Sequence, residues 1–187
     1  AERYKDRVLD TIYIGGGTPT TLEAEELTRI LNKLGKSFDL SHLKELTVES
    51  GRADSITYEK LLAMKEGGVT RISVNPQTMK QETLDLIGRK HTVEQVKEAF
   101  ALAREAGFFN INMDLILGLP GETAEDVRNT MAEIKKLAPD SLTVHSLAIK
   151  RASRLNRWIE ENGISLLNNT EETMGITMEG AGEMGLL

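Results

Sequence analysis

The chain has 187 residues, is 40% hydrophobic and carries a net charge of −6, values that are typical of a folded domain with a sizeable core. The excess of 29 acidic over 23 basic residues argues against a nucleic-acid-binding surface spread over the whole protein. The longest apolar run, Leu115 to Leu119, is far shorter than the roughly 20 residues that a membrane span needs. No basic segment followed by an apolar stretch opens the chain, so we expect a cytoplasmic protein.

The sequence contains no cysteine. This excludes disulfides, thiolate zinc sites, a cysteine nucleophile and a cysteine-ligated iron–sulfur cluster built from this chain alone. The chain begins with Ala1 rather than Met, so we expect it to be part of a longer protein.

Short β-rich runs alternate with longer amphipathic runs along the chain. The predicted strands are residues 11–14, 45–49, 70–74, 111–117 and 140–145. The predicted helices are residues 22–34, 57–66, 81–87, 93–106, 123–137 and 155–161, and capping-box patterns open the helices at Thr92 and Thr123. The alternation predicts an α/β fold of parallel βαβ units, either an open doubly wound sheet or part of a (β/α) barrel.

Residues 168–187 differ from the rest in composition, because they contain four glycines and no sustained hydrophobic period. We therefore expect a folded core over residues 1–167 and a poorly structured or truncated segment over residues 168–187.

A glycine-rich run, Gly15-Gly16-Gly17-Thr18-Pro19-Thr20, directly follows the first predicted strand. It lacks the Lys and hydroxyl of a phosphate-binding P-loop, and the dinucleotide fingerprint fails at Thr20. Three glycines still allow a ligand to approach the backbone closely, with carbonyls that suit an ammonium or amides that suit a carboxylate. A tight turn without any ligand explains the glycines equally well.

Polar residues gather at the carboxyl ends of the predicted strands, where parallel α/β folds bind their ligands: Glu49, Asn75, Gln77, Asp114, His145 and Ser146. Asp114 lies in the apolar frame NINMDLILGLP, so its carboxylate needs hydrogen-bond donors. The two hydroxyls of a ribose would provide them, and the alternative is a structural cap on a neighbouring loop amide.

Two further features have both a functional and a structural interpretation. Arg89, within Gly88-Arg89-Lys90-His91, either binds a ligand carboxylate or lies at a solvated helix end. His91 and His145 lack a third partner at metal-ligand spacing, so we expect a structural or surface role for both and predict no metal site. No serine lies in a nucleophile motif, so hydrolase chemistry has no support.

Five segments together resemble the radical S-adenosylmethionine (SAM) enzymes of the oxygen-independent coproporphyrinogen III oxidase family: GGGTPT, VES, RISVNPQT, LIGRKHT and NINMDLILGLPGET. The resemblance runs from about residue 10 to residue 148. The segments RISVNPQTM and HSLAIKRASRL look most like the coproporphyrinogen dehydrogenase branch, and the haem-chaperone branch is also similar.

The resemblance implies a partial TIM-like (β/α)6 barrel, of which this chain supplies strands two to six. It also implies a role for each matching residue in binding SAM, without assigning any catalytic residue. Gly16, Gly17 and Thr18 would hold the methionine part, and Arg89 would pair with its carboxylate. The ribose and amine region would be lined by Glu49, Gln77 and Asp114, and the adenosine would pack beside Ala148.

The family's Cys-x-x-x-Cys-x-x-Cys loop, which binds a 4Fe–4S cluster, has no counterpart in this chain. We expect that loop before Ala1, and we expect the chain alone to be inactive. The resemblance implies that the intact protein takes a porphyrinogen substrate and electrons from a donor, and converts coproporphyrinogen III to protoporphyrinogen IX by oxidative decarboxylation in haem biosynthesis. The alternatives are a haem chaperone on the same scaffold and an unrelated (β/α) phosphate-sugar enzyme, although no phosphate loop supports the latter.

Overall fold

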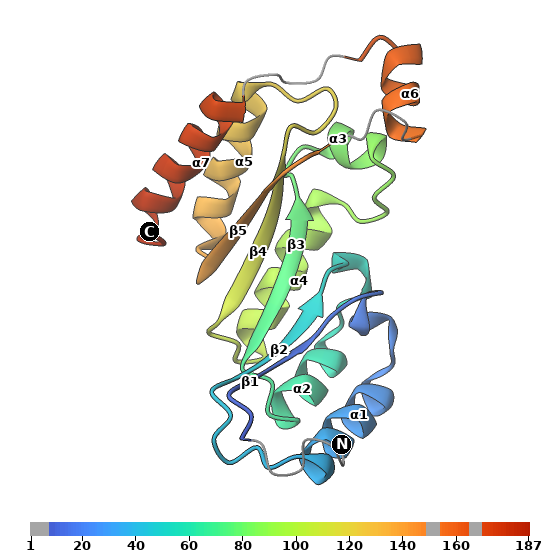
Figure 1. The fold of residues 1–187 in the computed structure, drawn as a ribbon, viewed down its shortest axis with the longest axis vertical. Coiled ribbons are helices and arrows are strands. Elements are labelled where there is room, and N and C mark those ends of the chain that lie inside the picture. Colours follow the sequence, from blue (N-terminus) through green and yellow to red (C-terminus); the bar gives the residue numbers. More distant parts are fainter. Residues whose placement is uncertain (1–7, 149–153, 165–169) are drawn as a thin grey trace. The chain divides into compact units, whose positions relative to one another are not determined.

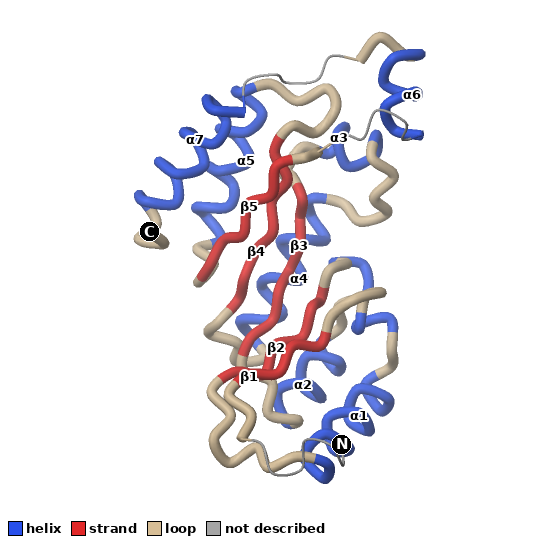
Figure 2. The backbone as a smooth tube through the Cα atoms, in the orientation of Figure 1, coloured by secondary structure: helices blue, strands red, loops and turns tan. Residues whose placement is uncertain are grey.

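The computed structural model describes residues 8–148, 154–164 and 170–187. Five strands form one sheet in the order β1-β2-β3-β4-β5, shown in Figures 1 and 2. Their bounds are β1 (Thr11–Ile14), β2 (Glu45–Ser50), β3 (Arg71–Gln77), β4 (Ile111–Leu117) and β5 (Ser141–Ser146). Strand order therefore follows chain order, which is the arrangement of a (β/α) barrel and not of a doubly wound sheet, where the order reverses at a switch point.

Helices alternate with these strands, as the sequence predicted. They are α1 (Ala24–Ser37), α2 (Tyr58–Glu66), α3 (Gln81–Leu86), α4 (Val93–Glu105), α5 (Ala124–Leu137), α6 (Arg154–Glu161) and α7 (Thr170–Glu183). Among the described residues, none of these helices is long and apolar enough to cross a membrane.

The chain divides into two compact units. The first unit comprises Ala1–Asn75 and Glu94–Asn112, and the second comprises Pro76–Val93 and Met113–Leu187. Strands β3 and β4 each contribute residues to both units.

The first unit has an apolar core between its strands and helices. Parallel pairing places Val48 of β2 beside Ile14 of β1 and Ile72 of β3. Leu31 of α1 and Met64 of α2 are also buried, and the two helices lie side by side in Figure 1. A side chain on Gly67, at the end of α2, would collide with Leu31, so glycine at this position allows the helices to approach closely.

The other face of the same strands is polar. At the amino ends of the strands, the polar side chains on this face bind one another. The Arg71 guanidinium lies 3.5 Å from Glu45 Oε2 and donates a hydrogen bond of 3.2 Å to Asn112 Oδ1. Thr47 donates a hydrogen bond of 2.8 Å to Glu45 Oε1. Residues from β2, β3 and β4 are thereby joined within the first unit.

In the second unit, α5 begins where the sequence predicted. Thr123 and Asp126 form a capping box, in which each side chain accepts a hydrogen bond from the backbone amide of the other residue. The buried side of α5 carries Val127, Met131 and Ile134.

Helix α7 occupies most of the segment that the sequence predicted to be poorly structured, and the predicted boundary at residue 167 lies outside the described residues. The helix packs along α5 (Figure 1), and Lys135 of α5 forms an ion pair of 2.8 Å with Glu183. Its buried positions recur with helical spacing but are mostly small or polar: Thr173, Ile176, Thr177 and Ala181. At Gly180 a side chain would meet Met131 at 2.7 Å, so the glycine permits close packing of the two helices.

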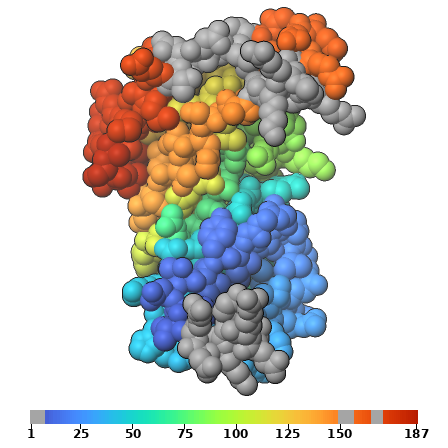
Figure 3. Space-filling model, in the orientation of Figure 1, coloured from blue at the N-terminus to red at the C-terminus, as the bar shows by residue number. Residues whose placement is uncertain are grey.

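Strand β1 lies at one edge of the sheet, and Figure 3 shows the blue region that contains it on the molecular surface. Its Tyr13 side chain is 65% exposed. An unprotected edge strand can pair with a second chain. We therefore expect the chain to self-associate at high concentration, and the Tyr13→Lys variant to do so less because a charge at the edge disfavours pairing.

Light scattering across a concentration series measures this effect. The matched control is Phe109→Lys, which replaces an exposed aromatic side chain outside the strands. Monomeric behaviour of the unsubstituted chain throughout the series would contradict the prediction.

Candidate functional site

The glycine-rich loop forms one part of the candidate site, in the first unit. Gly16 has φ +109°, and a side chain there or at Gly17 would meet nothing within 4 Å. Gly15 differs, because a Cβ atom there would lie 2.3 Å from the Tyr13 ring and 2.7 Å from Glu49 Oε2. A side chain at position 15 would therefore displace Tyr13 and Glu49 from their present positions, and the positive φ at position 16 favours glycine. The loop presents an open backbone surface at Gly16 and Gly17.

Glu49, at the carboxyl end of β2, is attached to this loop. Its Oε2 atom accepts a hydrogen bond of 3.2 Å from the Gly16 amide, so the structure brings these two predicted residues together. Thr18 closes the loop by donating its amide to the Gly16 carbonyl at 2.9 Å. A carboxylate beside backbone carbonyls makes this part of the site rich in acceptors, which suits a bound cation such as an ammonium group.

Strand β3 adds two buried polar groups to the same end of the first unit. A Cβ atom on Gly51 would lie 3.5 Å from both Asn75 Nδ2 and Glu49 Oε1, so these side chains flank the same glycine. The Oδ1 atom of Asn75 and the Oγ atom of Ser73 are buried without a hydrogen-bond partner among the described residues. Buried polar atoms in this condition are unfavourable unless a water molecule or a ligand satisfies them.

The second unit contains Gln77 and Arg89. Gln77 is buried and has a left-handed backbone with φ +70°, which is uncommon for a residue with a side chain. Arg89 is half-buried and follows Gly88, which has φ +72°. No hydrogen bond or ion pair engages the Gln77 amide or the Arg89 guanidinium within residues 8–148, 154–164 and 170–187.

Arg89 lines an open cavity of about 770 Å3 in the second unit. The other lining residues are mostly apolar: Leu86, Ile87, Gly88, Ile116, Leu119, Pro120, Leu147 and Trp158. An apolar cavity with one guanidinium suits a ligand that combines a flat ring system with a carboxylate. Ala148 is exposed and directly follows the lining residue Leu147.

Asp114 lies in β4, two residues before the lining residue Ile116, and is half-buried. It already makes a polar or electrostatic contact within the structure. Both interpretations of Asp114, as a ribose-binding group and as a structural cap, are therefore consistent with its surroundings.

The two histidines lie in different environments. His91 is buried at 1% exposure, whereas His145 and the adjacent Ser146 are exposed at the end of β5. In the part of the chain that the structure describes, no group of three or more His, Cys, Asp or Glu side chains could hold a metal ion.

Sequence reasoning missed a buried polar network that directly follows Gln77. Thr78 donates a hydrogen bond of 2.5 Å to Glu122 Oε1 and lies 3.3 Å from Thr130 Oγ1. Burial raises the pKa of the Glu122 carboxyl, and the charge of Asp126 raises it further. Hydrogen bonds from Thr78 and Thr83 and the positive charge of Lys80 oppose this increase in the pKa. The only trace of this network in the sequence is the GET triplet after Pro120.

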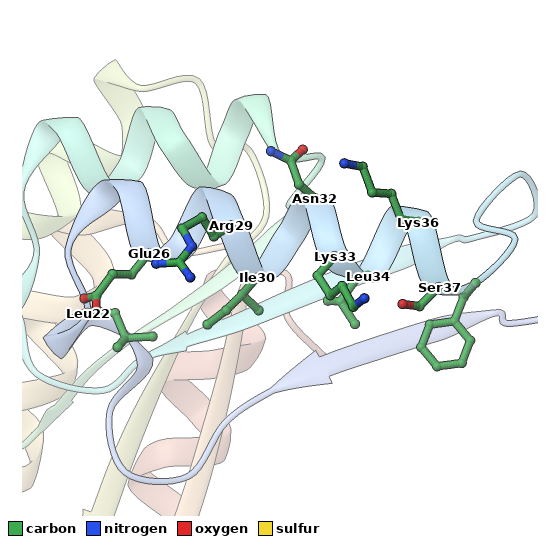
Figure 4. Close-up of a pocket in the computed structure, with 10 residues that line it drawn as sticks. Leu22, Glu26, Arg29, Ile30, Asn32, Lys33, Leu34, Lys36 and Ser37 are labelled. Carbon is green, nitrogen blue, oxygen red and sulfur yellow. The ribbon is translucent and has the colours of Figure 1, made fainter. Parts of the chain in front are cut away.

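A separate open groove of about 860 Å3 runs along α1 (Figure 4). Its lining includes Leu22, Arg29, Ile30, Lys33 and Phe38. None of the predicted site residues lines this groove.

Comparisons with known proteins identify relatives of this chain. The sequence profile of the Radical SAM superfamily matches residues 1–134. The oxygen-independent coproporphyrinogen-III oxidase-like protein HemZ of Bacillus subtilis is 50% identical over 153 residues, which cover 81% of this chain and 30% of HemZ. Heme chaperone HemW of the same organism is 38% identical over 143 residues, covering 76% of this chain and 38% of HemW. The oxygen-independent coproporphyrinogen III oxidase of Salmonella typhimurium is 30% identical, and the match covers 79% of this chain and 32% of that protein.

The chain thus spans about a third of the length of these relatives. Among solved structures, the coproporphyrinogen III oxidase HemN from Escherichia coli matches with a TM-score of 0.85 and 26% identity, covering 97% of this chain and 42% of HemN. This match confirms the predicted fold, a partial TIM-like (β/α)6 barrel. Elp3 from Methanocaldococcus infernus has a similar fold, with a TM-score of 0.72 and 22% identity, and the match covers 91% of this chain and 45% of Elp3. At this identity the match supports the fold and nothing more.

The buried carboxyl of Glu122 predicts a pH-dependent stability. Because its pKa is raised above the ordinary 4.5, the folded chain holds this proton more tightly than the unfolded chain does. The stabilisation is therefore fully present below about pH 4.5 and is lost as the pH rises through the folded-state pKa. We expect Glu122→Gln to raise the melting temperature at about pH 7.5, and the gain to shrink toward about pH 4.5.

Thermal melts across this pH range measure the difference. Glu179→Gln, an exposed substitution on α7, controls for the change in net charge. A Glu122→Gln variant that is less stable than the unsubstituted chain at every pH would contradict the prediction.

Proposed function

Because the chain belongs to the radical SAM superfamily, we propose that it forms the SAM-binding part of a haem-pathway protein. Proteins of this superfamily use SAM together with a 4Fe–4S cluster. Its relatives include both coproporphyrinogen oxidases and haem chaperones.

SAM carries an ammonium, a carboxylate, a ribose and an adenine, and each unit by itself contains residues that fit some of these groups. In the first unit, the open backbone at Gly16, Gly17 and Thr18 and the adjoining Glu49 carboxylate would hold the ammonium end. In the second unit, the Arg89 guanidinium, which has no partner among the described residues, would bind the carboxylate.

The remaining contacts would also come from the second unit. Gln77 and Asp114 would bind the ribose hydroxyls, and the apolar surface that ends near Ala148 would accept the adenosine. The structural observation that supports this assignment is a pair of polar groups that lack a partner in the part of the chain that the structure describes, the Gln77 amide and the Arg89 guanidinium. A ligand would satisfy both.

The 4Fe–4S cluster does not fit this chain, because cluster ligation in this family needs cysteine thiolates and the sequence has none. We propose that residues outside this chain supply the cysteines. The role of the chain is then to bind and orient SAM, and the electron donor acts on a part of the protein beyond this sequence.

For the whole protein we propose oxygen-independent oxidative decarboxylation of coproporphyrinogen III to protoporphyrinogen IX. Bound SAM would supply the 5′-deoxyadenosyl radical chemistry by which a substrate propionate loses a hydrogen atom. Release of CO2, and of one electron to an acceptor outside this chain, would then leave a vinyl group. The 50% identity with HemZ carries this proposal, since HemW is more distant at 38%. The second candidate is a haem chaperone, which the HemW relatives support.

The reaction is tested on the whole protein that contains this chain, after anaerobic reconstitution of its cluster. Coproporphyrinogen III, SAM and a chemical reductant are supplied, and 5′-deoxyadenosine and protoporphyrin are quantified by chromatography. We expect both products. Stoichiometric haem binding without decarboxylation would favour the chaperone, and the absence of both activities would overturn the proposal.

Asp114→Ala tests the assignment of the ribose contact. Loss of a charge-assisted hydrogen bond costs roughly 1.5–3 kcal/mol, so we expect SAM affinity of the whole protein to fall about tenfold to hundredfold. Stability should change little, because a partly desolvated charge is lost as well. Calorimetric titration with SAM and a melting curve measure the two effects, with exposed Asp10→Ala as the matched control. Unchanged affinity with a lower melting temperature would identify Asp114 as a cap.

A further inference from the structure

A chain of hydrogen bonds in the second unit holds the three residues that follow Gln77. The amide of Met79 donates to Thr130 Oγ1 at 3.1 Å, and the amide of Lys80 donates to Thr78 Oγ1 at 3.2 Å. The hydroxyls of Thr78 and Thr130 lie 3.3 Å apart, and Thr78 donates to Glu122 Oε1 at 2.5 Å. Two consecutive backbone amides are thus bound to side chains rather than to a strand or a helix.

The hydroxyl hydrogens can be oriented in only one way along this chain. Each threonine has a single hydroxyl hydrogen, and Thr78 gives its hydrogen to Glu122. Thr130 must then donate to Thr78 while accepting from the Met79 amide. Glu122 is the last acceptor, and it sets the direction of the bond between the two threonine hydroxyls.

The direction of these hydrogen bonds matters because the side chains that form them are buried. Thr78 is 1% exposed, Thr130 6% and Glu122 5%, so bulk water does not substitute for a lost partner. Without the Glu122 carboxylate, the Thr78 hydroxyl would have to turn to Thr130 Oγ1, and the Thr130 hydroxyl would then lose Thr78 as its acceptor. On the outer side, Lys80 Nζ bonds to Asp126 at 2.9 Å and contacts the Gly121 carbonyl at 3.4 Å, which joins the same turn to the segment that carries Glu122.

The hydrogen-bond network bears on the backbone conformation of Gln77. Its φ of +70° is costly for any residue with a Cβ atom, so the surrounding structure must maintain it. In the described chain, the Gln77 side chain has no hydrogen-bond partner that could do so. The residues immediately after it are the ones tied down by Thr78, Thr130 and Glu122.

We propose that Glu122 is a positioning residue: through Thr78 and Thr130 it holds residues 78–80, and thereby keeps Gln77 in the left-handed conformation that presents its amide to the ligand. The role of Gln77 in binding SAM rests on the function proposed above. The conformational role of Glu122 does not.

The backbone effect is measured by comparing alanine and glycine at position 77. Both substitutions remove the side chain, so the difference between them reports the backbone conformation. With Glu122 present, we expect Gln77→Gly to melt a few degrees above Gln77→Ala, because glycine adopts a positive φ without strain. In the Glu122→Ala background we expect this preference to disappear or reverse, since the turn then relaxes.

Two further variants separate positioning from a general loss of stability. Glu122→Gln retains an oxygen that accepts from Thr78, so it should preserve the preference for glycine. Thr177→Val, on α7, removes a buried hydroxyl whose hydrogen-bond partners, the Thr173 and Met174 carbonyls and the Met174 sulfur, all lie in its own helix. It should lower the melting temperature without changing the preference at position 77. A preference for glycine that persists in Glu122→Ala would overturn the proposal.

SAM titration of the whole protein distinguishes this proposal from the proposed function. If both hold, Glu122→Ala weakens SAM binding, and adding Gln77→Ala weakens it little further, because the two act through one contact. Loss of the glycine preference with unchanged SAM affinity would support the positioning role and overturn the assignment of Gln77 to SAM. Fully additive losses would show that Glu122 affects SAM by another route, and would overturn its role in positioning Gln77.

Discussion

The alternation of side chains along the parallel strands is the constraint on which the candidate site depends. In β2 and β3, alternate residues enter the core, and most of them are apolar, as Val48 and Ile72 are. The residues between them form a polar row on the other face, which includes Glu49 beside Ser73. Because all the strands run in one direction, the carboxyl end of this row coincides with the loop that follows β1. The apolar core therefore fixes where the acceptor groups of the site lie.

The polar side chains at the two ends of this row differ in whether the protein supplies their hydrogen-bond partners. At the amino end, Arg71 joins Glu45 and Asn112, so the protein supplies its own counter-charge and donors. Toward the carboxyl end, Ser73 Oγ and Asn75 Oδ1 are buried without partners among the described residues. Leaving such groups unsatisfied reduces stability, so this end of the row is suited to a ligand or ordered water, whereas the amino end has a structural role.

The sequence predicted the elements that large apolar residues or caps define, and missed those that depend on distant contacts. The Thr123 capping box and the strand over residues 111–117 were located from local pattern alone. Helix α7 was missed because two threonines and an alanine occupy three of its four buried positions, and Ile176 alone gives no hydrophobic period. Strand β3 extends to Gln77, beyond the predicted end at residue 74, although Pro76 is typical of a strand end.

The same distinction applies to the candidate site. Residue types at strand ends pointed to Glu49 and Asp114. Nothing local in the sequence predicts the left-handed backbone of Gln77. The contact proposed to hold it joins the next residue, Thr78, to Glu122, which lies 44 positions further along the chain. The buried carboxyl of Glu122 is unfavourable for stability at neutral pH, and an apolar residue of similar size at position 122 would avoid that cost. A carboxyl at position 122 is nevertheless consistent with the proposed role, because proteins accept a loss of stability where a strained backbone conformation must be held beside a binding site.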